Sequence, residues 1–266
     1  MLGNVTIGQY FPGDTPVHKL DPRTKIVLTI VVVAATFAAA DFLAYGLLAA
    51  FFVFVAALGR LSFVRLLRSV KPLWPIILIT FLVHVFSGQG DALFSLFIFK
   101  ITKAGLAQGI LMGLRLVFLI LFSSLMTMTT SPLELTDGLE RLLRPFRRIG
   151  VPAHELAMMM TIALRFIPTL LQETERIMMA QSARGADFKS GGLTRKAKNM
   201  LTLIVPLFLS AFRRADELAT AMEARCYHGG EGRTRMHELA LEKSDALAAA
   251  LVGFLAVVLA FARWYG

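Results

Sequence analysis

Two short stretches of the chain end a helical pattern on an arginine with small neighbours. They are Ala183-Arg184-Gly185 and Ala224-Arg225-Cys226. A guanidinium group presents several hydrogen-bond donors in a planar fork, which suits an acidic or carbonyl-lined groove on another protein. The simpler alternative is that each cation only offsets the dipole of its own helix, an effect worth roughly 0.3–1 kcal/mol. The occurrence of the same ending on two helices of similar length favours a binding role.

The residue patterns of common catalytic and metal sites are absent from the sequence. It contains no G-x-x-x-x-G-K-[ST] phosphate-binding loop, no H-E-x-x-H zinc motif and no G-x-S-x-G nucleophile motif. The single cysteine, Cys226, excludes an internal disulfide and a cysteine-based metal cluster. We therefore expect no catalytic residue, no metal site and no cofactor bound by this chain.

The composition is that of an integral membrane protein. Hydrophobic residues make up 56% of the 266 positions and charged residues only 17%, which is too apolar for an ordinary soluble domain. The formal net charge is +10, and the basic residues flank apolar runs. This placement favours positively charged cytoplasmic loops over nucleic-acid binding, so the expected partner is the lipid bilayer and not a nucleic acid.

Five apolar runs predict transmembrane helices. In chain order they cover residues 26–40, 42–58, 72–86, 105–128 and 246–262. Because a spanning helix needs about 20 residues, the first two runs must include flanking residues at the membrane surface, with a tight turn at Asp41. Two polar residues lie inside runs. We expect His84 to be a satisfied, buried histidine and Arg115 to have a buried partner.

Residues 131–244, between the fourth and fifth runs, are expected to lie on the cytoplasmic side. They hold 17 of the 28 Lys and Arg residues. The apolar stretch 156–171 contains Arg165, which would cost about 3 kcal/mol in the bilayer, and a crossing there would place one basic cluster outside. The predicted regions are therefore 1–130 with four spans, 131–245 in the cytoplasm and 246–266 as the last span. The N-terminus is expected inside the cytoplasmic membrane and the C-terminus outside.

Three helices are predicted in the cytoplasmic region. The sequence SPLEL from Ser131 is typical of a capping box and begins the first. The second runs from Ala153 to about Ala183 and the third from Leu193 or Thr194 to about Ala224, each on the order of 45 Å long. The expected fold is all-α, with about five transmembrane helices and an insert of about three helices, two of them long.

With these features the chain resembles the transmembrane coupling (T) component of energy-coupling factor (ECF) type ABC importers of vitamins and metals. The N-terminal YFPGDTPVHKLDPRTKI, residues 10–26, is similar to the opening signature of that family. RFIP at residues 165–168 is similar to a further recurring element, and the two Ala-Arg-small stretches to its paired coupling motifs. Cys226 departs from the glycine or serine expected in the second motif.

The resemblance implies a non-catalytic subunit that passes the conformational change of two ABC ATPase subunits to a membrane-embedded substrate-binding (S) component. Arg184 and Arg225 would dock into the ATPases, which bind ATP and Mg themselves. His18 in the signature is expected to have a structural role and not to bind metal. Five methionines of the second long helix form an adaptable apolar surface: Met158, Met159, Met160, Met178 and Met179. Ordinary helix packing is one explanation of them, and a groove for the S component is the other.

A membrane-embedded enzyme acting on lipids or prenyl groups is the alternative from another functional class. It would need acidic or histidine residues gathered at the cytoplasmic face, whereas the acids of this region are scattered without a DDxxD-like cluster. A complete permease of an ordinary ABC importer would need polar pathway residues in its spans, and the five runs have few.

Overall fold

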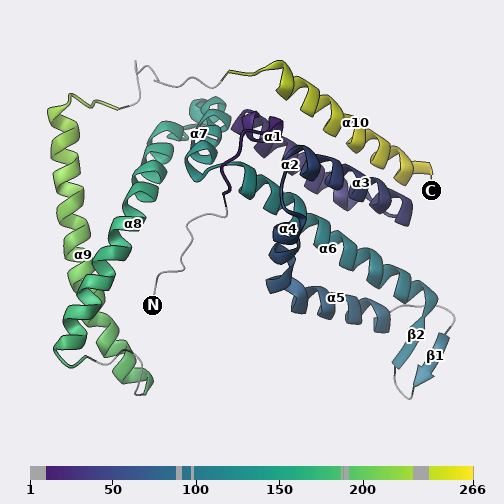
Figure 1. Ribbon diagram of the computed structural model, residues 1–266, viewed down its shortest axis with the longest axis horizontal. Helices are drawn as coiled ribbons and strands as arrows, with labels where there is room; N and C mark the ends of the chain where they lie inside the picture. The colour runs from purple at the N-terminus through teal and green to yellow at the C-terminus, as the bar shows by residue number, and fades with distance from the viewer. Residues whose placement is uncertain are drawn as a thin grey trace. The chain divides into compact units, whose positions relative to one another are not determined.

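The structure, a computed structural model, describes residues 10–87, 92–96, 99–186, 188, 192–229 and 240–265. Its helices are α1 (Pro16–Lys19), α2 (Pro22–Ala38), α3 (Phe42–Leu58), α4 (Phe63–Val70), α5 (Trp74–Ser87), α6 (Lys103–Thr129), α7 (Pro132–Leu143), α8 (Ala153–Ala183), α9 (Leu193–Ala224) and α10 (Lys243–Tyr265). Two 3-10 segments, η1 (Lys71–Leu73) and η2 (Arg144–Ile149), and two strands, β1 (Ala92–Leu96) and β2 (Phe99–Thr102), complete the described elements (Figure 1).

The predicted all-α membrane fold is confirmed, with one local difference. The five predicted spans correspond to α2, α3, α5, α6 and α10. Between α5 and α6, outside the five predicted spans, the strands β1 and β2 pair as an antiparallel hairpin. A two-stranded hairpin adds little to the core of such a fold, so the helical architecture is unaffected.

The chain divides into two compact units, which we describe separately. The spanning unit comprises the described residues of Gly8–Gly138 and Glu238–Gly266, and the crossed-helix unit those of Leu139–His237. Among the described residues, four helical segments are long and apolar enough to cross a membrane: Phe63–Ser87, α6, α8 and Lys243–Trp264. α3 is apolar but shorter. By length and composition α8 thus also qualifies as a span, and its placement in the cytoplasm stays a prediction from charge.

The core of the spanning unit forms around α6. This helix packs against α2, α3, α4 and α5, while α10 packs against α2. Aromatic side chains fill the centre, where the ring of Phe52 meets that of Phe122 edge-on at 5.6 Å between centroids. At Gly109 of α6, a Cβ atom would lie 3.0 Å from Cγ2 of Val85 and 3.1 Å from the carbonyl oxygen of Phe81. A small residue here lets the α5 and α6 backbones approach closely.

Both polar residues within the predicted spans have partners, as expected from the sequence. Nε of Arg115 donates to the hydroxyl of Tyr45 at 3.2 Å, and its Nη2 donates to the carbonyl of Ala39 at 3.1 Å. Nδ1 of His84 donates to the carbonyl of Thr80, one turn earlier, at 2.8 Å. Each group thereby exchanges water for a protein acceptor, which reduces the cost of holding it among apolar side chains.

The N-terminal signature forms a buried polar network that joins α2 to the beginning of α10. The backbone N–H of Asp21 donates to Asp245 at 2.9 Å, and the second carboxylate oxygen of Asp245 accepts from the N–H of Glu242. The carboxylate of Asp21 caps α2 through the N–H of Arg23 and pairs with its guanidinium at 2.8 Å. Residues more than 200 positions apart in sequence are therefore held together by short bonds to charged groups, the stronger class of hydrogen bond.

Lys25 extends this network to the end of α6. Its side chain is almost completely buried, with a residue exposure of 6%, and its ammonium group donates to the carbonyls of His18 at 2.8 Å and Thr129 at 3.0 Å. Both carbonyls lie at the C-terminal ends of helices, where a cation is favoured. The lysine thus fastens α1, α2 and α6 at one point.

His18 has the structural role that the sequence predicts. Its Nε2 lies 3.0 Å from the carbonyl oxygen of Phe11, and its Nδ1 lies 2.6 Å from the hydroxyl of Thr15. Since a carbonyl can only accept, Nε2 is the donor, and in the neutral ring Nδ1 accepts from Thr15. The ring therefore fixes the segment before α1.

The predicted capping box at Ser131 is confirmed and starts α7. The N–H of Ser131 donates to the Glu134 carboxylate at 3.0 Å, and the N–H of Glu134 donates to the Ser131 hydroxyl at 3.2 Å. Further along α7, a Cβ at Gly138 would lie 3.0 Å from Cβ of Pro22 and 3.2 Å from Cδ1 of Ile26. α7 is therefore pressed against the first turn of α2.

Candidate functional site

The two long helices of the crossed-helix unit begin and end where the sequence predicts. α8 covers Ala153–Ala183 and α9 covers Leu193–Ala224, so Arg184 and Arg225 are the residues that cap their C-terminal ends. Each helix contains one internal proline, Pro168 in α8 and Pro206 in α9. A proline removes one hydrogen bond of the helix and favours a local bend, but neither ends its helix.

α8 closes with a Schellman motif around Arg184. Gly185 has φ +88°, the left-handed conformation that glycine adopts without a steric penalty. The N–H of Gly185 donates to the carbonyl of Ser182 at 3.0 Å, and the N–H of Ala186 donates to that of Gln181, also at 3.0 Å. These bonds satisfy carbonyls that the helix itself leaves open.

α9 closes with the same motif around Arg225, although no glycine is present. Cys226 takes the left-handed conformation, with φ +57°. Its N–H donates to the carbonyl of Glu223 at 2.9 Å, and the N–H of Tyr227 donates to that of Met222 at 3.1 Å. Cys226 is therefore the structural counterpart of Gly185, and the departure from glycine leaves the cap intact at a conformational cost of about 1–2 kcal/mol.

The two caps hold the two arginines in equivalent positions. Arg184 and Arg225 have similar backbone angles, φ −84° and ψ 6° against φ −93° and ψ 15°, and both side chains are exposed. Among the residues that the structure describes, neither guanidinium forms an ion pair. Ala183 and Ala224 precede them, and the small side chains leave each guanidinium accessible to a partner. Two accessible cations in similar backbone settings fit two similar anionic or carbonyl-lined sockets.

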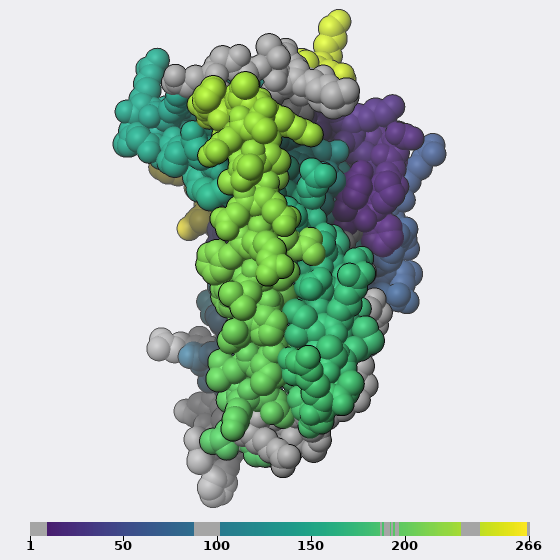
Figure 2. Space-filling model, turned by 90° about the vertical axis from the view of Figure 1, so that its left-hand side faces the viewer, coloured from purple at the N-terminus to yellow at the C-terminus, as the bar shows by residue number. Residues whose placement is uncertain are grey.

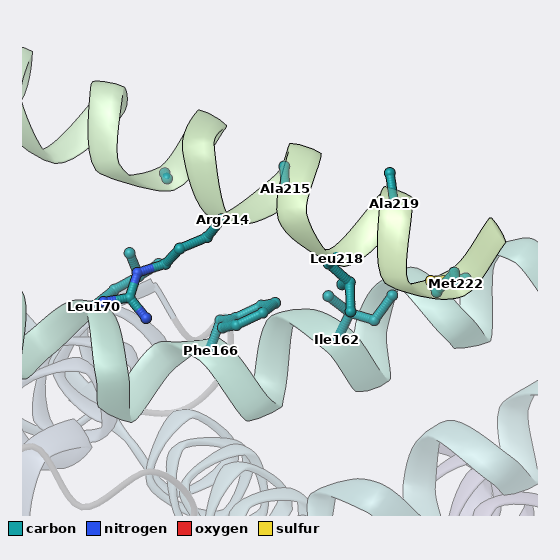
Figure 3. Close-up of a pocket in the computed structure, with 9 residues that line it drawn as sticks. Ile162, Phe166, Leu170, Arg214, Ala215, Leu218, Ala219 and Met222 are labelled. Atoms are coloured by element: carbon teal, nitrogen blue, oxygen red, sulfur yellow. The ribbon is translucent and has the colours of Figure 1, made fainter. Parts of the chain in front are cut away.

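α8 and α9 pack against each other as an antiparallel, crossed pair (Figures 1 and 2). Nη2 of Arg214 on α9 lies 3.7 Å from the carboxylate of Glu173 on α8. Between the helices is an apolar groove of about 310 Å³, into which Phe166, Ile162 and Leu218 project (Figure 3). Phe166 belongs to the RFIP element, whereas its neighbour Arg165 is exposed. The contact braces each helix against the other over part of its length.

The packing also separates the two arginines. Met222, three residues before Arg225, lines the same groove as Ile162 of α8. From Ile162 to Arg184 the helix advances by about 30 Å at 1.5 Å per residue. Arg184 and Arg225 therefore lie far apart, at opposite ends of the packed helix pair.

The five methionines predicted to form a soft surface divide into two groups. Met159, Met160 and Met179 are exposed on α8, whereas Met158 and Met178 are partly buried. The exposed members leave the docking alternative open, and the partly buried ones fit ordinary helix packing.

A larger apolar surface on α9 was missed by the sequence analysis. We call it the α9 stripe; its exposed members are Met200, Leu201, Ile204, Val205, Phe208, Leu209 and Phe212. Successive members are alternately one and three residues apart, so the pattern repeats every four residues and places them on one face of the helix. The sequence analysis did not name this surface, although the spacing of its residues is visible in the sequence. A continuous exposed apolar face of this kind marks a contact with protein or lipid.

Among the described residues, no group of three or more His, Cys, Asp or Glu side chains could hold a metal ion. One polar contact in this unit joins Nδ1 of His154 to the carboxylate of Glu140 at 3.1 Å. The two exposed arginines and the exposed apolar face are features suited to binding a partner.

Comparison with known proteins agrees with this arrangement. Residues 13–237 match the family described as cobalt transport protein. The chain is 59% identical over 264 residues to the energy-coupling factor transporter transmembrane protein EcfT of Acidaminococcus fermentans, covering 99% of this chain and 98% of the relative. It is 49% identical to the protein of the same name from Clostridium kluyveri and 47% identical to that of Bacillus subtilis, with at least 99% of each chain covered.

The chain belongs to this family of energy-coupling factor transporter transmembrane proteins. Membership confirms the resemblance drawn from residues 10–26, from RFIP and from the two Ala-Arg-small stretches. It also makes the chain a multi-pass membrane protein and a transport subunit. The alternative of a lipid- or prenyl-modifying enzyme is not supported, because the matched proteins are transporter components.

The two caps predict opposite effects of two small substitutions. Gly185→Ala places a Cβ in the left-handed region and should weaken the end of α8 by about 1 kcal/mol. Cys226→Gly removes that strain from the end of α9. The helix end should become more stable by up to about 1 kcal/mol, because the greater conformational entropy of glycine in the unfolded chain offsets part of the gain. Amide hydrogen exchange of residues 185–186 and 226–227 reports this directly, since 1 kcal/mol is about a fivefold change. Equal exchange in both variants and the unaltered protein would show that the caps do not hold these ends.

Proposed function

We propose that this chain is the coupling subunit of an ECF-type ABC importer. It passes the conformational change of two ABC ATPase subunits to a membrane-embedded substrate-binding subunit, for uptake of vitamins or transition-metal ions. The observation that carries the proposal is the pair of equivalent, exposed arginines at the two ends of one braced helix pair. The names of the relatives and the description of the matched family support it.

The ATPase contacts are the two capped helix ends. Ala183, Arg184 and Gly185 enter a groove on one ATPase subunit, and Ala224, Arg225 and Cys226 enter the corresponding groove on the other. Arginine suits this task because its fork donates several hydrogen bonds within one plane. ATP and Mg are bound by the ATPase subunits, and this chain contributes no catalytic group or cofactor.

The crossed helices act as levers. The groove between α8 and α9 is apolar and is flanked by the Arg214–Glu173 ion pair, so the two helices resist being pulled apart. When the ATPase pair closes or opens, the separation between its two grooves changes. Because Arg184 and Arg225 lie about 30 Å apart, that change alters the crossing of α8 and α9 and moves the surfaces they carry.

The substrate-binding subunit contacts the α9 stripe together with the exposed methionines of α8. Phe208 and Phe212 form the most aromatic part of this surface, with exposures of 58% and 65% and ring centroids 6.3 Å apart. Aromatic and methionine side chains are enriched in protein interfaces, and methionine adapts to differently shaped partners. A surface of this kind suits a coupler that accepts a mobile membrane partner.

The crossed-helix unit lies in the cytoplasm, the N-terminus is inside and the C-terminus is outside the cytoplasmic membrane. The support is the distribution of basic residues, with 17 of 28 Lys and Arg between residues 131 and 244. The exposed Arg165 and the arginines near both ends of α8 fit an aqueous setting for this helix.

Charge reversal at both helix ends should abolish assembly with the ATPases. We expect Arg184→Glu combined with Arg225→Glu to lower co-purification of the ATPase subunits more than tenfold, because loss of a buried, hydrogen-bonded interface charge costs 2–5 kcal/mol. The matched control is Arg176→Glu with Arg213→Glu, which changes the same charge at exposed positions of the same helices. We call the Arg184→Glu, Arg225→Glu protein the tip variant. If it still assembles and transports while both variants insert normally into the membrane, these arginines do not bind the ATPase subunits.

Substitutions in the α9 stripe should weaken binding of the substrate-binding subunit and leave ATPase binding intact. Phe208→Gln with Phe212→Gln removes the aromatic part of the stripe and should reduce co-purification of the substrate-binding subunit at least tenfold, while ATPase binding is retained. The tip variant should instead retain the substrate-binding subunit and lose the ATPase subunits. Retention of the substrate-binding subunit by the phenylalanine variant would place its contact elsewhere on the chain.

A further inference from the structure

The 3-10 segment η2 (Arg144–Ile149) exposes basic and large apolar side chains together. Phe146 is 50% exposed and Ile149 is 80% exposed, and Arg144, Arg147 and Arg148 are also exposed. We call these five residues the η2 patch. Isolated apolar residues are common on protein surfaces, but two that lie among three arginines within one six-residue segment are the composition of an interfacial membrane contact.

The η2 patch is held by its own cap. Gly150 has φ +92°, its N–H donates to the carbonyl of Arg147 at 3.1 Å, and the N–H of Val151 donates to that of Phe146 at 3.3 Å. Pro145 fixes the first turn of the segment. The side chains of the patch therefore project from a closed turn, and their exposure is a property of that local fold.

Chain connectivity limits how far the patch can lie from the bilayer. α7 is pressed against Pro22 and Ile26 at Gly138, and Ile26 is the first residue of the first apolar run. Arg144 follows Gly138 by six residues of continuous helix, or about 9 Å. Ile149 is at most about 10 Å further along a 3-10 rise. Covalent connectivity alone thus keeps the patch within about 20 Å, or about two Debye lengths, of the contact between Gly138 and Ile26.

We propose that the η2 patch binds the headgroups of anionic phospholipids. Its arginines donate to lipid phosphate, for which the guanidinium fork is well matched, and Phe146 and Ile149 insert at the boundary between headgroups and acyl chains. Each basic residue near an anionic leaflet contributes about 1 kcal/mol. Among the described residues, Arg144 and Arg148 have no ion pair of their own, so their charges are available to lipid.

This contact gives the N-terminal end of α8 a fixed point. α8 begins at Ala153, four residues after Ile149. A lever transmits displacement from one end only if its other end is restrained, and lipid binding at η2 would supply that restraint at the membrane surface. The inference goes beyond the proposed function and needs only that the chain lies in a membrane. Failure of lipid binding would therefore leave the proposed ATPase contacts of Arg184 and Arg225 untouched, and the reverse also holds.

The test is a tryptophan reporter in the full-length protein. Phe146→Trp is made with Trp74→Phe and Trp264→Phe, so that the reporter is the single tryptophan, and the protein is reconstituted in vesicles of phosphatidylcholine and phosphatidylglycerol. Bromine atoms on the acyl chains of one lipid at a time quench a tryptophan that contacts that lipid. We expect blue-shifted emission and at least twofold stronger quenching by brominated phosphatidylglycerol than by brominated phosphatidylcholine at equal bromine content.

Two matched variants separate charge recognition from simple proximity. Arg144→Gln with Arg148→Gln should remove the preference for the anionic lipid, whereas Arg176→Gln with Arg213→Gln should preserve it. Absence of quenching by both lipids, or equal quenching by both in the unaltered patch, would overturn the proposal. Shielding of the reporter only after ATPase subunits are added, independent of lipid composition, would show that the patch binds protein instead.

Discussion

The left-handed residue after each long helix is the constraint on which the coupling geometry depends. A helix leaves its last carbonyls without partners, and the Schellman closure satisfies them while turning the chain sharply away. In that closure, the side chain of the residue just before the left-handed position is the last one to project from the end of the helix. Here it is Arg184 in α8 and Arg225 in α9. The caps therefore do two things at once: they end the helices and they leave an arginine accessible at each end.

Within the spanning unit, the N-terminal signature holds several helices together. Asp21, Lys25 and Asp245 bring α1, α2, α6 and the start of α10 together through bonds of 2.8–3.0 Å. The network is buried and its charges are paired or hydrogen-bonded. Loss of one partner would leave another charge uncompensated, which is far more costly than loss of a surface pair. The same groups explain why a motif so rich in charge precedes the first apolar run.

Helix limits and caps were predictable from the sequence, whereas exposure was not. The bounds of α8 and α9 followed from the helical patterns that end at the two Ala-Arg-small stretches, and the capping box at Ser131 from its residue spacing, because these are local properties. Cys226 looked like a departure from the motif, since only coordinates show that it takes the same left-handed turn as Gly185. The partner of Arg115 could be expected but not named, because Tyr45 and Ala39 are distant in sequence. The α9 stripe was missed because the spacing of its residues is visible in the sequence but their exposure is not.

The central claim is that a capped arginine end of α9 plugs into an ATPase subunit on the cytoplasmic side. The single cysteine of the chain, Cys226, is exposed beside Arg225, so the native protein carries its own reporter. The most direct measurement is the rate of Cys226 modification by a membrane-impermeant maleimide in sealed vesicles of either orientation. The account predicts modification only from the cytoplasmic face and strong protection when the ATPase subunits are assembled. Modification from the outer face, or an unchanged rate in the assembled complex, would contradict it.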